Sequence, residues 1–287
     1  MRNKQIFLIS FIIYLCTISS VRAGEYHLLP EPQKFTPLGS SFVLGRTKLS
    51  TPVLRQEWEA FVVDRGGVID DKARASIEVK LVPSLEEVPL NADEAYRLVV
   101  NNGKVTVEAV TEHGMYLAMQ TLAELKVVQK KKATFNGCSI VDWPAFRIRG
   151  FMQDVGRTYM SIEELKREIA VLSRFKINVF HWHLTENQSW RLQSKIFPML
   201  NDSVNTTRMP GKYYTLEEAK DLVAFCKAHN ILLIPEFDMP GHSGAFVRTF
   251  RHDMQIPEGM KILKLLVDEG CENVDVPYLH IGPDEVR

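Results

Sequence analysis

Short apolar runs alternate with amphipathic helical patterns through the second half of the chain, and no other feature restricts its fold as much. The runs predicted to be strands cover residues 147–154, 177–184, 231–238 and 276–281. Two of the helical patterns begin with a capping box, Ser161 with Glu164 and Thr215 with Glu218, and a third covers 258–274. Strands that alternate with helices predict a parallel sheet with right-handed crossovers, and nearly all-apolar strands are typical of a sheet covered on both faces.

Two architectures fit this order, a doubly wound open sheet and an eight-fold barrel. The glycine-rich fingerprint that cradles a nucleotide phosphate follows none of the strands, which disfavours the nucleotide-binding form. Polar side chains gather instead where the predicted strands end, as in barrel active sites. They are Arg149 and Asp154, then His181, His183 and Glu186, then Glu236, Asp238 and His242, and last Asp284 and Glu285. The sequence therefore predicts an α/β fold that contains the first four strands of a TIM (β/α)8 barrel.

The first half of the chain has a different pattern. Residues 76–82 and 96–109 alternate apolar and polar side chains, and Asn102 with Gly103 supplies a hairpin turn within the second segment. A helical face then covers 113–129. Strands followed by a helix predict a small α+β accessory domain without a catalytic constellation. The expected domains are a signal peptide at 1–23, the accessory domain at 24–143 and the first half of a barrel at 144–287.

The N-terminal residues match a secretory signal peptide. Arg2 and Lys4 precede an apolar segment, 6–18, and small residues follow up to Ala23. The apolar segment is short for a membrane span, so we expect cleavage after Ala23, no stable membrane span and a periplasmic, surface or extracellular location. Cys16 raises the alternative of a lipoprotein anchor, but the two residues before it are bulky.

Charge and cysteine content exclude several classes of function. The chain has 35 acidic and 35 basic residues, so net charge gives no support for a nucleic acid or a charged membrane as partner. Three cysteines remain after residue 23, an odd number at wide spacings that indicates neither a disulfide framework nor a metal knuckle. The expected partner is therefore a neutral molecule, with no cofactor and no metal.

The acids near the C-terminus suit the cleavage of a glycosidic bond. That reaction needs a proton donor for the departing oxygen and a group that stabilises positive charge at the anomeric carbon. A carboxylic acid in an apolar, like-charged setting stays protonated near neutrality, and Glu285 beside Asp284 has such a setting. Trp182, Trp190 and His183 are expected to contact a sugar, whose ring faces stack on indoles.

Four segments in order resemble glycoside hydrolase family 20, the β-N-acetylhexosaminidases. They are 149–157 (RGFMQDVGR), 176–186 (KINVFHWHLTE), 235–242 (PEFDMPGH) and 280–285 (HIGPDE). The predicted α+β unit before them is similar to the accessory domain of that family. The resemblance implies a retaining hydrolase that removes terminal non-reducing β-linked N-acetylhexosamine, N-acetylglucosamine or N-acetylgalactosamine, from a glycan. In this substrate-assisted reaction the acetamido oxygen of the sugar attacks the anomeric carbon.

The resemblance also implies roles for individual residues. Glu285 is expected to be the general acid and then the general base, and Asp284 to orient the acetamido N–H. Arg149 is expected to bind the 3- and 4-hydroxyls of the sugar. Four further residues are expected to bind substrate or to support the residues that do, namely His183, Glu186, Glu236 and His242.

The chain departs from the family pattern at three places. Glu186 and Asn187 stand where the family often has two acids, which puts the role of the first acid in question. Pro283 stands where the family commonly has glycine before the catalytic pair. Its fixed backbone angle affects the direction of the Asp284 side chain. From Arg147 on, the chain is about half as long as a typical barrel. We therefore expect a piece of a longer protein that, expressed alone, is inactive or aggregates.

Two other functions remain open. A metal-dependent hydrolase is one, because His181 and His183 lie on one strand face and His242, Asp238 or His280 would complete a metal site. A non-catalytic sugar-binding protein is the other.

Overall fold

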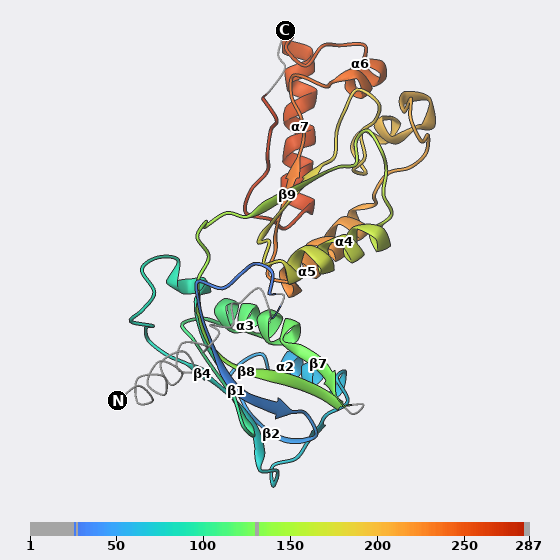
Figure 1. Cartoon of the computed structure of the whole chain (residues 1–287). Coiled ribbons are helices and arrows are strands. Elements are labelled where there is room, and N and C mark those ends of the chain that lie inside the picture. The colour runs from blue at the N-terminus through green and yellow to red at the C-terminus, as the bar shows by residue number, and fades with distance from the viewer. Residues whose placement is uncertain (1–25, 27, 130–131, 284–287) are drawn as a thin grey trace, which may run out of the picture. The chain divides into compact units, whose positions relative to one another are not determined.

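The computed structural model describes residues 26, 28–129 and 132–283 (Figure 1). The chain divides into two compact units, 1–145 and 146–287, and each is described by itself. Within the described ranges, no helix is both long and apolar enough to cross a bilayer.

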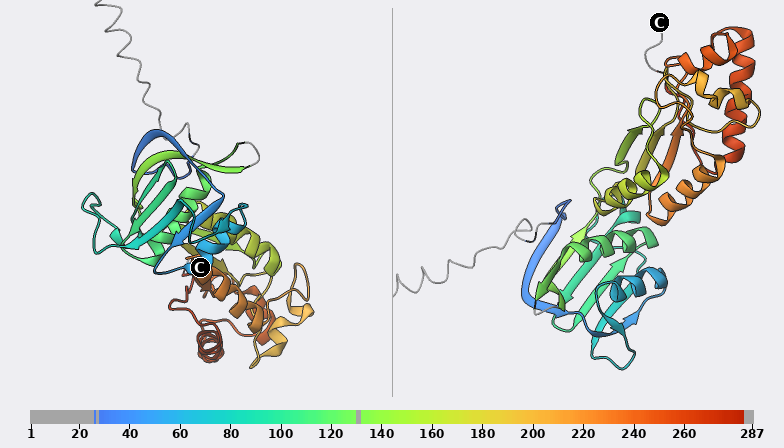
Figure 2. Two further views of the ribbon diagram at one scale, coloured as in Figure 1. Left: turned by 90° about the horizontal axis from the view of Figure 1, so that it is seen from below. Right: turned by 90° about the vertical axis from the view of Figure 1, so that its right-hand side faces the viewer.

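The first unit is built on a mixed sheet. In the described residues the strand order is β1-β8-β5-β6-β4-β2-β3, and β7 pairs with β8 outside this path. The strands are β1 (Lys34–Val43), β2 (Arg46–Ser50), β3 (Val68–Ile69), β4 (Ala75–Leu81), β5 (Tyr96–Asn101), β6 (Lys104–Ala109), β7 (Lys126–Gln129) and β8 (Lys132–Asp142). Helices α2 (Arg55–Val63) and α3 (Glu112–Glu124) lie on one face of this sheet, and the short 3-10 helix η2 spans Ala92–Glu94 (Figure 2).

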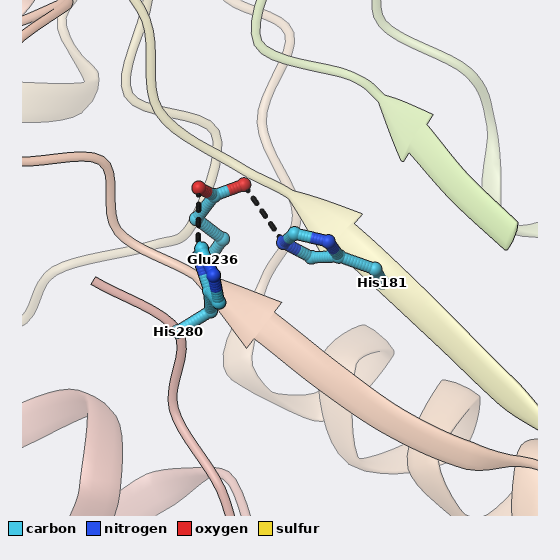
Figure 3. Close-up of side chains that lie close together, drawn as sticks. All are labelled: His181, Glu236 and His280. Carbon is cyan, nitrogen blue, oxygen red and sulfur yellow. Dashed lines mark hydrogen bonds and ion pairs between the residues drawn. The ribbon is translucent and has the colours of Figure 1, made fainter. Parts of the chain in front are cut away.

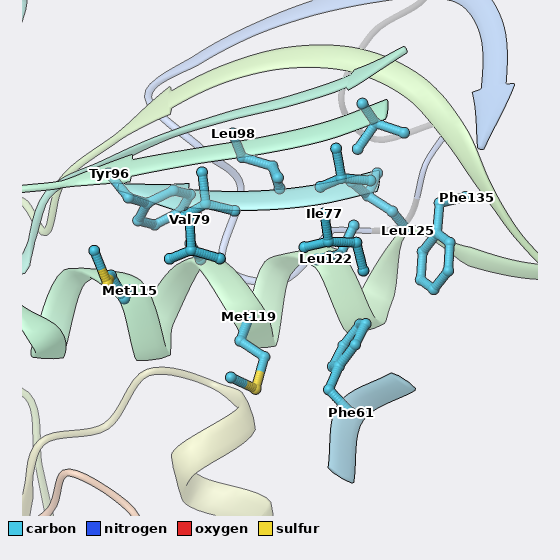
Figure 4. Packing of buried hydrophobic residues seen from close by; sticks show 14 of the residues in the cluster. Phe61, Ile77, Val79, Tyr96, Leu98, Met115, Met119, Leu122, Leu125 and Phe135 are labelled. Atoms are coloured by element: carbon cyan, nitrogen blue, oxygen red, sulfur yellow. The ribbon is translucent and has the colours of Figure 1, made fainter. Parts of the chain in front are cut away.

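Side-chain periodicity explains why one sheet face is covered. Every second residue of β5 and β6 is buried, as Leu98 and Val107 are, and α3 packs its apolar side against this face through Met115 and Leu122 (Figure 4). The predicted hairpin is confirmed, because β5 and β6 pair antiparallel around Gly103, whose φ is +72°.

The predicted helix at 113–129 ends too late. Helix α3 stops at Glu124, and 126–129 form β7, which pairs with the start of β8. Adjacent valines at 127 and 128 favour a strand, and the pairing with β8 adds backbone hydrogen bonds that a helical period does not predict.

The second unit contains a parallel sheet in the order β11-β10-β9. These strands are β9 (Gly150–Asp154), β10 (Val179–His183) and β11 (Leu232–Glu236). The helices are α4 (Ile162–Arg174), α5 (Leu216–Ala228), α6 (Gly244–Phe250) and α7 (Pro257–Asn273), and the 3-10 helices η3 (Pro198–Asn201) and η4 (Ser203–Asn205) lie in the loop after β10. The two predicted capping boxes are confirmed at the starts of α4 and α5, and the third predicted helix agrees with α7 within a residue.

The core of the second unit lies between its helices and strands. Phe180 and Leu233 of the sheet pack in the same buried cluster as Leu165 of α4 and Leu222 of α5. Helix α7 approaches the end of β11 so closely that a Cβ on Gly270 would lie 2.6 Å from the ring of Phe237. Glycine is therefore needed here for close packing.

The predicted fourth strand is not a regular strand in the described residues. The segment runs parallel to β11 but pairs with it through one bridge, Glu236 with His280. The amide of His280 donates to the carbonyl of Pro235 at 2.9 Å, and the amide of Phe237 donates to the carbonyl of His280 at 3.0 Å. Prolines at 277 and 283 lack an N–H, which limits pairing on both sides of His280.

Candidate active site

An open hollow of about 380 Å³ lies at the carboxyl edge of the parallel sheet in the second unit. The strand register places Asp154, His183 and Glu236 at the same level, because His183 pairs with both of the others. Parallel strands end at one edge, so residues distant in sequence meet there. The hollow is lined by Met152, Arg157, His181, His183, Glu236, His242, His280, Gly282 and Pro283.

Glu236 is the centre of a histidine network in this hollow (Figure 3). Its Oε2 accepts from His183 Nδ1 at 2.5 Å and lies 2.9 Å from His181 Nε2, and its Oε1 accepts from His280 Nδ1 at 2.9 Å. His181 and His183 both reach Glu236 because residues two apart on a strand point to the same face. The Glu236 side chain is buried, and its hydrogen bonds replace the water it loses.

This network changes the pKa of its members in opposite directions. Burial disfavours the charged form of Glu236, but hydrogen bonds from His181 and His183 outweigh it, and the pKa of the Glu236 carboxyl falls well below its usual range. Burial also disfavours charged His183, but the hydrogen bond to Glu236 and its charge outweigh burial and raise the pKa of His183. The pair is therefore stabilised as carboxylate and imidazolium.

A second group of charged side chains, His242, Asp238 and Glu186, lies beside the histidine network of Glu236. His242 Nδ1 donates to Asp238 Oδ2 at 2.5 Å and lies 3.4 Å from Glu186 Oε1. The Asp238 amide donates to Thr185 Oγ1 at 2.8 Å, which connects the loop after β11 to the loop after β10. His242 has a φ of +45°, so its backbone is held in a left-handed conformation that few side chains adopt.

Arg157 presents its guanidinium to the hollow from the loop after β9. Its side chain donates to Asp154 Oδ2 at 2.6 Å and forms a close ion pair with Glu186. Glu186 is 1% exposed, whereas the Arg157 side chain is 45% exposed. Two carboxylates therefore hold an arginine that is open to a ligand, which is a geometry suited to vicinal hydroxyls.

The prediction that Arg149 lies with the strand ends is wrong. Strand β9 begins at Gly150, so Arg149 precedes it, and a five-residue strand spans roughly 16 Å. Its Nε donates to the carbonyl of Lys176 at 2.7 Å and a terminal nitrogen donates to the carbonyl of Phe146 at 2.9 Å. Lys176 precedes β10, so Arg149 lies at the amino edge of the sheet, opposite the hollow.

The structure places the other predicted residues as follows. His183, Glu236 and His242 line the hollow, and Glu186 lies beneath Arg157. Asn187, which stands where a second acid was expected, accepts from the amide of Gly244 at 3.0 Å, at the start of α6. Asp284 and Glu285 lie outside the described residues.

The segment that leads to Asp284 is tightly restricted. Gly282 has a φ of +53°, and a Cβ there would lie 2.5 Å from both Asp238 Oδ1 and Glu236 Oε1. Only glycine fits at this position. The backbone just before the acidic pair therefore contacts the network in the hollow.

The two tryptophans expected to contact a sugar are buried instead. Trp182 is in contact with Tyr214 at a ring distance of 4.8 Å, and Trp190 packs on Phe237 at 4.9 Å. Trp182 points away from the hollow because it alternates with His181 and His183 on β10.

Sequence reasoning missed Arg191, which is fully buried. Its guanidinium donates to five backbone carbonyls of the described residues: Val155 at 3.1 Å, Gly156 at 3.4 Å, Met209 at 3.2 Å, Lys212 at 2.6 Å and Arg208 at 2.8 Å. Two of these carbonyls immediately precede Arg157.

The fold and the hollow define an α/β protein with a polar site at the carboxyl edge of a parallel sheet, where enzymes of this architecture place their active sites. The family model "Glycosyl hydrolase family 20, catalytic domain" matches residues 146–255, and the model "Glycosyl hydrolase family 20, domain 2" matches residues 25–143. The chain belongs to glycoside hydrolase family 20.

Known relatives agree with this assignment. The chain is 30% identical to a beta-hexosaminidase of Porphyromonas gingivalis, over 92% of this chain and 40% of the relative, and 30% identical to one of Vibrio furnissii, over 94% and 50%. The solved GH20 exo beta-N-acetylglucosaminidase of Vibrio harveyi, in complex with N-acetylglucosamine, is 28% identical with a TM-score of 0.79, over 93% of this chain and 48% of that one. The chain thus spans about half the length of these relatives.

Proposed function

We propose that the protein containing this chain removes terminal non-reducing β-linked N-acetylhexosamine from glycans with retention of configuration. The observation that carries this proposal is the position of Gly282 and Pro283. They line the hollow together with Arg157, Glu236 and His242, and Asp284 and Glu285 follow Pro283 directly in the sequence. The names of the relatives, beta-hexosaminidases, support the same reaction.

In this proposal the acidic pair carries the chemistry. Glu285 gives its proton to the departing glycosidic oxygen while the acetamido oxygen of the sugar attacks the anomeric carbon. Asp284 accepts a hydrogen bond from the acetamido N–H and stabilises the positive charge of the oxazolinium. Glu285 then takes a proton from the water that opens this intermediate, which restores the acid.

Arg157 replaces Arg149 as the proposed contact to the sugar hydroxyls. Its guanidinium lines the hollow and is held in place by Asp154 and Glu186, whereas Arg149 is occupied at the other edge of the sheet. Glu236, His183 and His242 support the walls of the hollow through buried charged hydrogen bonds.

We further propose that the parallel sheet is the first part of a (β/α)8 barrel. The alternation of parallel strands and helices supports this, and so do the apolar Phe151 and Met152 of β9, which are 37% and 54% exposed. The signal pattern at 1–23 supports export to the periplasm, the surface or the medium; those residues lie outside the described ranges.

Hydrolysis of a nitrophenyl N-acetyl-β-glucosaminide by the full-length protein tests the proposal. We expect Glu285→Gln to lower kcat by about 100-fold or more while N-acetylglucosamine still binds. Asp284→Asn should lower kcat as well. Asp275→Asn, which changes an exposed acid before the terminal segment, is the control. It should change neither kcat nor the binding of N-acetylglucosamine.

The two alternatives give different results in the same assay. A metal-dependent hydrolase would lose activity when a chelator removes its metal, whereas the proposed enzyme keeps it. A sugar-binding protein without catalysis would show no turnover, and Glu285→Gln would change nothing.

A further inference from the structure

We propose that His181, Glu236 and His280 form a binding site for one divalent transition-metal ion such as zinc, and that the bound ion inhibits the enzyme. One ligand atom from each of these side chains lies within 4.8 Å of the other two (Figure 3). The inhibition, but not the binding, rests on the proposed function.

The geometry needs little change to hold an ion. Zinc with nitrogen and oxygen ligands at about 2.0–2.2 Å in a tetrahedron places neighbouring ligand atoms roughly 3.3–3.6 Å apart. Each histidine nitrogen now lies 2.9 Å from an oxygen of Glu236. Each nitrogen therefore moves roughly 0.4–0.7 Å away from Glu236, and the two nitrogens, which now face different oxygens of Glu236 and lie within 4.8 Å of each other, converge on one ion by side-chain rotation.

The backbone that carries these ligands is well fixed. His181 and Glu236 belong to adjacent paired strands, β10 and β11. His280 is held beside β11 by its bridge to Glu236 and by its amide hydrogen bond to Pro235. Ligands on rigid elements lose little conformational entropy when they bind.

A second cluster, His183 with Glu236 and Asp238, is less suitable. All three of these side chains are buried, so an ion there is less accessible to water than one held by His181 and His280. The two clusters share Glu236, so they hold one ion between them. His280 is exposed and the His181 side chain is 24% exposed, and both line the hollow, which leaves an open fourth position for water.

The ligand set decides which ions fit. Two imidazole nitrogens and one carboxylate suit zinc, copper, nickel or cobalt, whereas magnesium and calcium prefer oxygen ligands alone. The predicted ligand is therefore a divalent transition metal.

An ion at this site competes with a sugar. It occupies the hollow beside Gly282, two residues before Asp284, and it takes Glu236 away from the hydrogen bond that holds His280. Both effects disturb the backbone that positions the acidic pair.

Isothermal titration of the purified, tag-free protein with zinc chloride tests the site. We expect one ion per chain, no binding of magnesium, and a loss of zinc affinity of at least about tenfold in His181→Ala and in His280→Ala. His252→Ala, which removes an exposed histidine outside the hollow, should bind zinc like the unchanged protein. Thermal unfolding of each variant shows whether it is folded. Since His280→Gln keeps an amide donor for Glu236, it gives a second variant if His280→Ala fails to fold.

Absence of zinc binding, or equal zinc affinity in all variants, overturns the metal site. Zinc should also inhibit hydrolysis of the nitrophenyl substrate, with at least about tenfold less inhibition in His280→Ala. If zinc binds as predicted but the protein hydrolyses nothing, the metal site stands and the proposed function fails. If hydrolysis occurs but zinc neither binds nor inhibits, the proposed function stands and the metal site fails.

Discussion

At the scale of single residues, each charged side chain in the hollow is held by a partner from another strand or loop. Glu236 of β11 contacts histidines of β10 and of the terminal segment, and Arg157 of the β9 loop contacts Glu186 of the β10 loop. A charge that is fixed before the ligand arrives costs less to position during binding or reaction. The hollow is therefore preorganised for a polar ligand.

Arg157 should matter for sugar binding, and Arg149 should not. Arg157→Lys removes a planar donor pair, so we expect KM for the nitrophenyl substrate to rise about tenfold or more. Arg149→Lys keeps a donor near the carbonyls of Phe146 and Lys176 and should leave KM unchanged. Steady-state kinetics of both variants decide this. A larger rise in KM for the Arg149 variant would show that the hollow is misassigned.

The ion pair of His183 with Glu236 should make stability depend on pH. The raised pKa of His183 means that its contribution is complete below the ordinary histidine value near 6.5 and is lost as pH rises through the folded value. The lowered pKa of Glu236 means that its contribution is present above about 4.5 and is lost as pH falls toward the folded value.

The free energy of unfolding of His183→Gln, compared with the unchanged protein, should therefore differ most between about pH 4.5 and 6.5. This difference should shrink at higher pH. Urea unfolding at pH 5.5 and pH 8.5 measures it, with His252→Gln as a control that shows no such trend. A difference that grows with pH would mean that His183 is neutral in the folded protein.

At the scale of elements, strands and helices place the hollow, and loops complete it. Helix α7 packs on Phe237, the residue after Glu236, and Arg191 fixes the loop before Arg157. Both contacts are buried and involve residues next to Glu236 or Arg157 in the sequence. Changes in packing should therefore alter the geometry of the hollow.

Gly270→Ala should destabilise the second unit. The added methyl would overlap the ring of Phe237, and overpacking costs about 1–3 kcal/mol, more than the gain in helix propensity. Chemical unfolding followed by tryptophan fluorescence measures the loss. Glu272→Ala, on an exposed position of the same helix, is the matched control. If the Gly270→Ala variant were as stable as the control, α7 would have to pack differently.

Arg191→Met should destabilise the same unit more. It leaves several buried carbonyls without a donor, and each such group costs about 1–3 kcal/mol. We expect a loss of at least about 3 kcal/mol in urea unfolding, with partial recovery in Arg191→Lys. Arg167→Met, at an exposed position of α4, should change little. A small loss in Arg191→Met would show that water reaches these carbonyls.

At the scale of the whole molecule, each unit has its own apolar core, and the two clusters share no residue. Local periodicity predicted the β5 and β6 hairpin, the three parallel strands and helices α4, α5 and α7, because each signal lies within at most 17 consecutive residues. It did not predict that β8 pairs with both β1 and β5, since those contacts join distant segments.

The sequence predicted the residues of the site that lie next to strand ends, but not those that depend on an exact strand boundary or on backbone contacts. His183 and Glu236 were found because they end apolar strands, and His242 because it lies in the loop that follows one of them. Arg149 was misplaced because the sequence does not fix the residue at which β9 begins, and a shift of that boundary moves a side chain to the other edge. Arg191 acts through backbone carbonyls, which leave no pattern in the sequence.

A crystal structure of the full-length protein with N-acetylglucosamine bound tests the central claim most directly. We predict that the sugar lies in the hollow at the carboxyl edge of β9, β10 and β11, with its hydroxyls about 3 Å from Arg157 and with Asp284 and Glu285 facing its acetamido group and anomeric carbon. A sugar bound elsewhere, or an acidic pair turned toward the edge where Arg149 lies, would contradict the account.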